Sequence, residues 1–441
     1  MAAGTTPNTI RFENLAEAAI RAISKPALEG LRRRAAERFE ALGLPTTRQE
    51  AWRFTDLGPL GRLAYAIPAA GAGVVAHEAL EPFLFPAAGG SRLVFVDGRY
   101  AQSLSHVEGL PKGATVRPLA GLAESEIEAL GRIADAEGHA FVALNTASWT
   151  DGALISIADG TALEAPMHLL FLGTTGDSAV VSQPRVLLQI GRGAQATVVE
   201  SYGSAGDGKA LTNAVTEAWL ADGAVLDHYR IQRQAAATYH FGTLAVRQSR
   251  ASSFRSFAFS AGARINRTEI RTVFDAEGAS CALNGLYLGR DRQLVDHQTS
   301  IDHATPHGTS TELYKGILDD RSRAVFNGEI IVRPDAQKSN ARQTNKNLIL
   351  SDETAVNSKP QLQIFANDVQ CAHGATVGQL DADSLYYMRT RGIPADRAAR
   401  LLTFAFASEL IDEIRIPGLR DLLFRSLFAD LPRVEDLSEH V

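Results

Sequence analysis

A thiol and an imidazole stand close together at one point of the sequence, Cys371 and His373 in the segment CAHGATVG (371–378). On an extended strand, side chains two positions apart point to the same face, so this pair would emerge side by side. A thiolate and an imidazole together suit a soft or borderline metal ion, including iron. Two ligands are only half of a metal site, and a second chain could supply the other ligands. A buried cysteine beside a hydrogen-bonded histidine is the alternative interpretation.

A second cluster lies between residues 296 and 307, where His297, His303 and His307 occur with Asp296 and Asp302. Imidazole and carboxylate groups at this density suggest a mononuclear metal site. The paired-histidine spacing typical of cupins is not present, and polar residues on a solvated sheet face explain the same sequence. A stand-alone metalloprotein or metalloenzyme built on these histidines is therefore an alternative function.

The overall composition limits the remaining possibilities. Lys and Arg number 44 against 50 Asp and Glu, a net charge of -6, which argues against a nucleic-acid partner. The two cysteines, Cys281 and Cys371, show no Cys-x-x-Cys spacing, so neither a zinc ribbon nor a disulfide framework is expected. No apolar stretch is long enough to span a membrane, and residues 1–13 lack a signal-peptide pattern. We expect a cytoplasmic protein without a membrane partner.

The candidate ligands lie in, or at the end of, a long region of strand and turn signals. From about Asp151 to Cys371, short apolar runs such as 154–157 and 186–190 alternate with Gly, Asp, Asn and Pro. We found no sustained repeat, so a sandwich, a barrel and a β-solenoid remain open. The polar character of 266–347 favours a solenoid, because stacked strands tolerate polar ladders on their outer faces.

Helical patterns return after Gly378. Pro394 suits a first helical position, and the helix is expected to run to about Ile414. Its apolar residues between 398 and 407 surround nearly the whole helix, which therefore requires burial on two faces. The amphipathic segment 419–428 could provide one of these faces or join a helix pair that binds another protein.

Five segments of the sequence resemble the SufB and SufD family of the SUF iron-sulfur cluster assembly system. They are PTTRQEAWRFTDL (45–57), FVALNTASWTDGALI (141–155), LNGLYLGRDRQLVDHQTSIDHATPHGTSTELYKGIL (283–318), FNGEIIVRPDAQKSNARQTNKNLILSDE (326–353) and CAHGATVGQLDADSLYYMRTRGI (371–393). Two departures from SufB-like sequences favour the SufD branch of this family. SufB-like chains tend to have Val-Glu-His-Glu-Ala-Thr in the last motif, and they carry an acceptor cysteine near the position of Asn345.

The resemblance implies a mainly β fold with helical ends: a right-handed parallel β-helix flanked by N-terminal and C-terminal helical regions. The implied domains are a mostly helical region at 1–145, the β-helix at 146–377 and a C-terminal helical region at 378–441. Without the resemblance, the strand pattern alone would leave all three β architectures open.

The resemblance also implies a function: a non-catalytic scaffold in a complex with SufB and the ATPase SufC, which assembles iron-sulfur clusters. Cys371 and His373 would contribute to iron acquisition or cluster formation at the SufB interface. The C-terminal helices would bind SufC through a set of residues comprising Leu385, Tyr386, Tyr387, Met388, Arg389, Leu401, Phe404 and Leu410. We expect no tightly bound cofactor in the isolated chain. In the complex we expect a transient iron-sulfur cluster, and a reduced flavin is a further candidate there. A homodimer of the isolated chain that carries iron or reduced flavin is a third possible function. Hydrolase chemistry by carboxylates on a face of the β-helix is a fourth.

Overall fold

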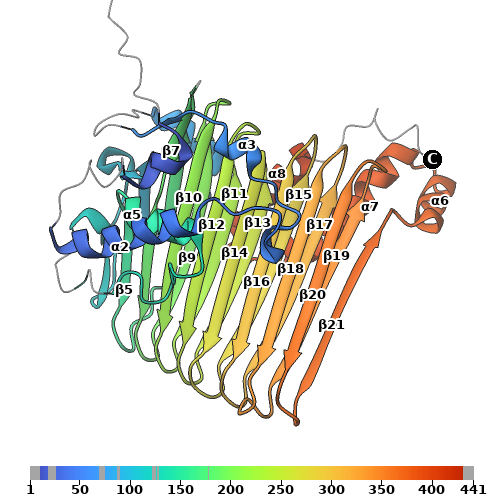
Figure 1. The fold of residues 1–441 in the computed structure, drawn as a ribbon. Coiled ribbons are helices and arrows are strands. Elements are labelled where there is room, and N and C mark those ends of the chain that lie inside the picture. The colour runs from blue at the N-terminus through green and yellow to red at the C-terminus, as the bar shows by residue number, and fades with distance from the viewer. Residues whose placement is uncertain are drawn as a thin grey trace, which may run out of the picture.

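A computed structural model describes residues 10–17, 26–68, 75–86, 90–121, 126, 129–176 and 178–430 of the chain. Its centre is a β-solenoid of about eight turns, in which each turn adds one parallel strand to each of two facing sheets (Figure 1). The mainly β fold with helical ends is therefore confirmed. Among the described residues, no helix is both long and apolar enough to cross a membrane.

The first sheet, called sheet A here, ends on β20. Its strands, in spatial order, are β4 (Ala114–Pro118), β5 (Gly152–Ile157), β8 (Arg185–Ile190), β10 (Ala210–Leu220), β12 (Tyr239–Gln248), β14 (Ile265–Phe274), β16 (Leu294–His303), β18 (Arg323–Val332) and β20 (Ala355–Ile364). Two shorter strands, β1 (Tyr65–Ala66) and β7 (Ala179–Ser182), pair beside this path. At the start of the sheet, β4 runs antiparallel to β5.

The second sheet, sheet B, ends on β21. Its strands, in spatial order, are β3 (Arg99–Tyr100), β2 (Arg92–Val96), β6 (Met167–Thr174), β9 (Gln195–Ala205), β11 (Val225–Arg233), β13 (Ser253–Ala261), β15 (Ser280–Gly289), β17 (Thr309–Leu318), β19 (Asn340–Ile349) and β21 (Gln370–Gly378). The antiparallel pair β2–β3 begins this sheet. Strands from the first 145 residues thus extend both sheets at the N-terminal end, while β20 and β21 finish the opposite end.

The repeat length varies from turn to turn. Successive partners in sheet A, namely Tyr239, Ile265, Leu294, Arg323 and Ala355, are 26, 29, 29 and 32 residues apart. The strands keep their register while the turns between them change in length. This variation explains why the sequence shows no repeat of fixed length.

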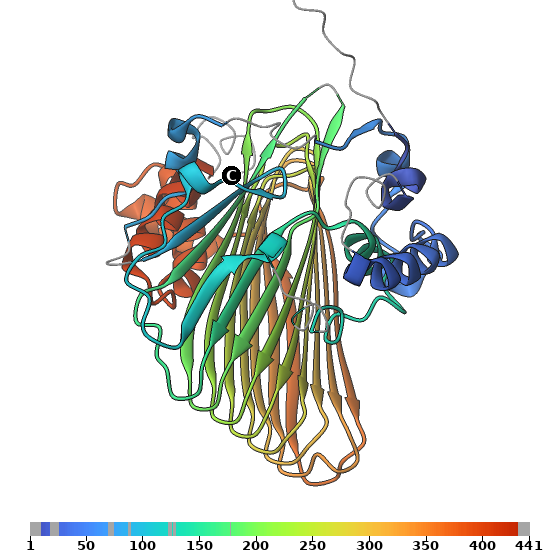
Figure 2. The same ribbon diagram turned by 90° about the vertical axis from the view of Figure 1, so that its left-hand side faces the viewer.

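Helices cover both outer faces of the solenoid (Figure 2). On the sheet A side, α2 (Pro26–Leu42) and α5 (Ala140–Ser148) share an apolar cluster with β10, β12 and β14. On the sheet B side lie α7 (Ala395–Ile411) and α8 (Pro417–Asp430), with α6 (Ala382–Thr390) beyond them near the C-terminal end. The remaining helices are short: η1 (Phe12–Asn14), η2 (Glu50–Trp52), α3 (Gly58–Gly61), η3 (His77–Phe83), η4 (Gln102–Leu104) and η5 (Leu119–Gly121).

Helix α7 is buried on two faces, as its sequence requires. Leu410 and Ile411 are fully buried in a cluster with Leu286 and Ile317 from the outer face of sheet B. At its other end, Ala398 packs against α6. Each large apolar side chain buried in this way contributes roughly 1.5–3 kcal/mol. The helix is therefore attached firmly to the strands that precede the open end of the solenoid.

Candidate functional site

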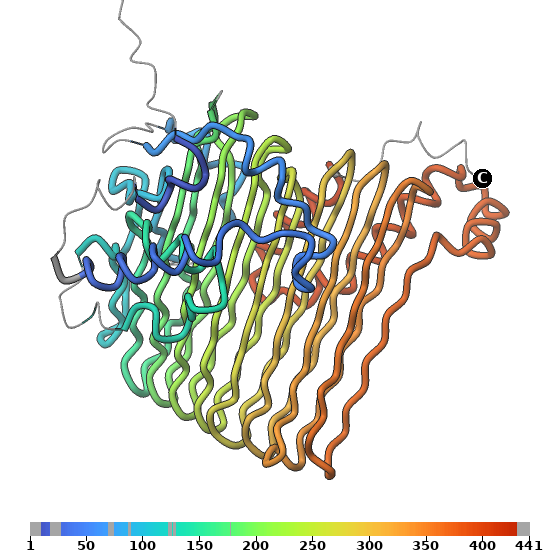
Figure 3. Tube along the Cα trace, in the orientation of Figure 1, coloured from blue at the N-terminus to red at the C-terminus, as the bar shows by residue number. Residues whose placement is uncertain are grey.

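Cys371 and His373 lie on β21, which pairs with β19 alone among the strands that the structure describes. The tube in Figure 3 shows β21 as the outermost strand at the C-terminal end of the stack. In register, Cys371 pairs with Ala341, and His373 pairs with Gln343. Since in-register residues of neighbouring strands point to the same side and both partners are buried, the two side chains belong to the interior face of the solenoid.

The open end leaves these interior-facing side chains accessible. Cys371 is half-buried against the main apolar core, whereas His373 and the rest of β21 are exposed. Partial burial raises the pKa of the Cys371 thiol above its ordinary value. The thiol therefore holds its proton at neutral pH and must release it before it can bind a metal.

The column that contains Cys371 continues into the solenoid through Ala341 and Ser310 to Cys281. Both cysteines of the chain therefore occupy one interior column, three turns apart, or about 14 Å at the usual strand spacing. Cys281 is only 4% exposed, and burial raises its pKa well above the ordinary value. It is a packed core thiol.

The neighbouring column carries His373, Gln343 and Glu312. Gln343 Nε2 donates a hydrogen bond of 2.7 Å to Glu312 Oε2. Thr299 also lies close enough to Glu312 to oppose the rise of its pKa, and among the described residues Gln343 Oε1 has no partner. Burial raises the pKa of Glu312 to about 7. This interior acid was not predicted from the sequence, because polar residues of the strands were expected to face outward. The alternation of Ser310, Glu312 and Tyr314 on one strand was the available signal.

The histidines of the second sequence cluster do not come together. His297 and His303 share the interior face of β16, but six residues of extended strand separate them by about 20 Å. His297 packs between the rings of Tyr287 and Tyr314, and burial lowers its pKa to about 3. His303 bonds to Ser310 at 2.8 Å, and His307 lies in an exposed turn. Within the described part of the chain, no cluster of three or more metal-ligating side chains exists.

Some of the residues predicted to bind SufC are exposed on the C-terminal helices, and others are buried beneath that surface. Tyr386 and Tyr387 on α6 and Leu401 on α7 are exposed, at 69%, 58% and 42% of their surface. Arg389 is exposed as well, while Met388 and Phe404 are half-buried. Leu385 packs beneath the surface against α7, and Leu410 is enclosed against sheet B. The last two therefore hold the helices in place and are not available to a partner.

Comparison with known proteins matches nearly the whole chain to one family. Residues 171–406 match the family described as SUF system FeS cluster assembly, SufBD core domain, and residues 10–169 match the SufBD protein N-terminal region. An iron-sulfur cluster assembly SufBD family protein of Synechocystis is 36% identical over 404 residues, covering 89% of this chain and 88% of the relative.

Two relatives bear the name iron-sulfur cluster assembly protein SufD. The Escherichia coli protein is 30% identical over 406 residues, covering 88% of this chain and 90% of its own. The Bacillus subtilis protein is 26% identical over 287 residues, or 65% of each chain. With both family regions matched and the solenoid in place, this chain belongs to the SufBD family of iron-sulfur cluster assembly proteins.

Proposed function

We propose that this chain is the SufD-type, non-catalytic scaffold subunit of a complex with SufB and SufC. The observation that carries the proposal is the position of Cys371 and His373 on the last strand of a solenoid whose end is open. There they form an incomplete ligand pair that a second subunit can complete. The iron-sulfur cluster is the cargo of this site, and the chain needs no cofactor of its own to present the pair.

The open end has the properties of a docking surface for another solenoid. Strands β20 and β21 each have one free edge, and their unpaired backbone groups can continue the ladder into a partner. Apolar side chains are also exposed there, with Ile364, Phe365 and Val377 at 41%, 60% and 49%. A SufB-type β-helix stacked on this end would bury these side chains and place its own ligands opposite Cys371 and His373.

The C-terminal helices supply a separate apolar surface for SufC. Tyr386, Tyr387, Leu401 and Phe428 are exposed on three different helices, α6, α7 and α8. Large exposed aromatic and apolar side chains are typical of protein interfaces. Motion of a SufC subunit bound here would act on the solenoid through α7.

A specific contact supports this transmission from α7 to the strands. Lys315 on β17 is 1% exposed, and its Nζ donates a 2.8 Å hydrogen bond to the carbonyl oxygen of Phe406 and pairs with Glu409. Strand β17 lies two strands before β21 in the same sheet. Displacement of α7 would therefore move the sheet that presents the ligand pair, a hinge-type coupling.

The test is a His373→Ala substitution in the chain co-expressed with SufB and SufC, with anaerobic purification and absorbance of the bound cluster. We expect the complex to assemble normally and to hold at least tenfold less cluster, because the exposed imidazole contributes to iron binding and little to packing. His77→Ala is the matched control, since His77 is also exposed but lies on η3, outside the open end. Wild-type cluster content in the His373→Ala complex would remove His373 from the site.

A further inference from the structure

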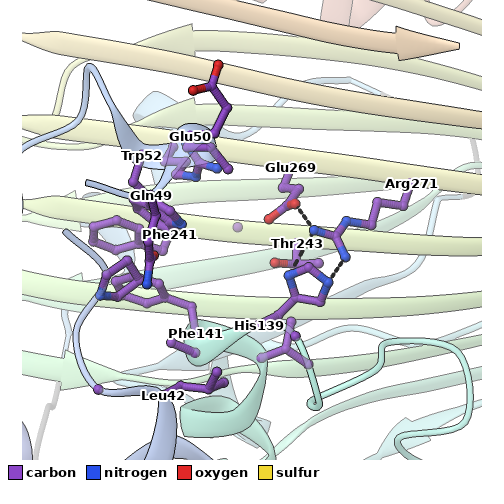
Figure 4. Close-up of a pocket in the computed structure, with 18 residues that line it drawn as sticks. Leu42, Gln49, Glu50, Trp52, His139, Phe141, Phe241, Thr243, Glu269 and Arg271 are labelled. Atoms are coloured by element: carbon purple, nitrogen blue, oxygen red, sulfur yellow. Dashed lines mark hydrogen bonds and ion pairs between the residues drawn. The ribbon is translucent and has the colours of Figure 1, made fainter. Parts of the chain in front are cut away.

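A cavity of about 300 Å³ lies between the N-terminal segments and the outer face of sheet A (Figure 4). Three parts of the chain enclose it: residues 42–52, residues 138–142 and side chains from β12 and β14. This volume lies at the lower end of the range for small-molecule sites. None of the functions proposed above uses it.

One wall of the cavity is aromatic. Phe141 and Phe241 stack with ring centroids 3.9 Å apart, and Trp52 stacks on Phe141 at 5.5 Å. The guanidinium of Arg267 lies 3.8 Å above the Trp52 ring and holds it in place. These four side chains come from four separate segments, so the wall forms only in the folded chain. Phe241 and Phe141 are 2% and 7% exposed, whereas Trp52 is half-buried, so Trp52 is the ring of this wall that a ligand can contact.

The opposite wall is polar and consists of Glu269, Arg271, His139 and Thr243. Arg271 pairs with the Glu269 carboxylate through Oε1 and contacts the His139 ring, with 2.9 Å between Arg271 Nη2 and His139 Nδ1. In the view of Figure 4, the Glu269 carboxylate lies between the aromatic rings and Arg271. A carboxylate offers about four acceptor positions, so one ion pair leaves Glu269 able to accept further N–H bonds.

Burial and the neighbouring arginines determine the protonation states of Glu269 and His139 in this wall. Burial would raise the pKa of Glu269, but Arg271 and Arg267 outweigh it and keep the pKa below its ordinary value. Burial and Arg271 lower the pKa of His139. At neutral pH, Glu269 is therefore a carboxylate and His139 is uncharged. Arg267 and Arg271 face Asp296 and Glu269, respectively, so among the described lining residues neither arginine is free to bind a phosphate.

We propose that this cavity binds a planar nitrogen heterocycle with adjacent N–H donors, of the guanine type, without a phosphate group. The ring would lie against Trp52, which Phe141 and Phe241 support from behind, and its N–H edge would donate to the Glu269 carboxylate. Paired donors on one edge match the two oxygens of a carboxylate, whereas a ring acceptor at that position would be repelled. The bound ring would link the segment 42–52 to sheet A.

The experiment is isothermal titration of the full chain with three nucleosides that differ at this edge. Guanosine presents two adjacent donors, inosine presents one, and adenosine presents a ring acceptor beside its amino group. We expect guanosine to bind most tightly, inosine several-fold more weakly and adenosine at least tenfold more weakly. Equal affinities for the three, or no binding of guanosine, would overturn the proposal.

Two variants test the two walls separately. Glu269→Gln should weaken guanosine binding at least tenfold and strengthen adenosine binding, because the amide nitrogen that replaces one carboxylate oxygen can donate to the ring acceptor of adenosine. Trp52→Leu should weaken all three nucleosides. Trp219→Leu is the matched control, since Trp219 is 53% exposed and does not line this cavity. Thermal unfolding of each variant verifies the fold, and tight guanosine binding by folded Glu269→Gln would contradict the assigned role of the carboxylate.

Discussion

The two cysteines of this protein occupy the same interior column of sheet B and differ only in the turn on which they lie. Cys281 has strands on both sides and is 4% exposed, while Cys371 has a strand on one side only and is half-buried. The same contrast separates His297, enclosed between two tyrosine rings, from the exposed His373. Position in the stack, rather than residue type, decides which thiol and imidazole can meet a ligand from another molecule.

The largest difference expected between the inner turns and the open end of the solenoid is in the reactivity of their thiols. Alkylation of Cys371 in the folded chain should be about 10³-fold faster than alkylation of Cys281, because Cys281 reacts only after the solenoid opens. Peptide mass spectrometry after timed treatment with iodoacetamide measures both rates in one sample. Rates within tenfold of each other would mean that the inner turns open readily and that the comparison fails.

The interior acid should make the stability of the inner turns depend on pH. Burial raises the folded-state pKa of Glu312 to about 7, against an ordinary value of 4.5. The unfolded chain therefore releases this proton at lower pH than the folded chain does. Its contribution to stability is complete below pH 4.5 and is lost as the pH rises through 7.

Replacement of Glu312 by Gln measures that contribution. Relative to the variant, the wild type should lose on the order of 3 kcal/mol of unfolding free energy between pH 4 and pH 8. Urea unfolding of both proteins gives the difference in unfolding free energy between wild type and variant at pH 4 and at pH 8. A difference that does not change with pH would show that Glu312 titrates normally and is not enclosed.

Substitution of a histidine in an inner turn and of one at the open end should give a smaller difference, which is in unfolding free energy. His297→Ala should lower the unfolding free energy by about 2 kcal/mol, because it leaves a cavity between Tyr287 and Tyr314. His373→Ala should change it by less than about 0.5 kcal/mol, since the side chain is exposed. Urea unfolding of both variants at one pH tests this, and equal losses would place His373 in a packed environment.

Part of this architecture could be predicted from local sequence. The strand region, the two-sided burial of the helix after Pro394 and the shared face of Cys371 and His373 all follow from periodicity and turn residues. The choice of a solenoid came from family resemblance, because the turns vary in length and hide the repeat. Asn284-Gly285 and Asn327-Gly328, which look alike in sequence, lie in different sheets.

The environment of each site residue was harder to predict. Nothing local distinguishes His297 from His373, since burial depends on whether a further turn follows in the stack. The inward direction of Glu312 and Gln343 likewise depends on strand register across 31 residues. The cavity beside Trp52 joins segments that are more than 200 residues apart in sequence, such as Ala51 and Arg267.

The open end is the central claim, and hydrogen exchange with and without a SufB-type partner tests it most directly. Binding of the partner should slow amide exchange in residues 355–364 and 370–378, which form the free edges, and leave the inner strand 280–289 unchanged because it is already protected. Slowed exchange on the outer face of either sheet, with β20 and β21 unaffected, would contradict the proposed docking of two solenoids end to end.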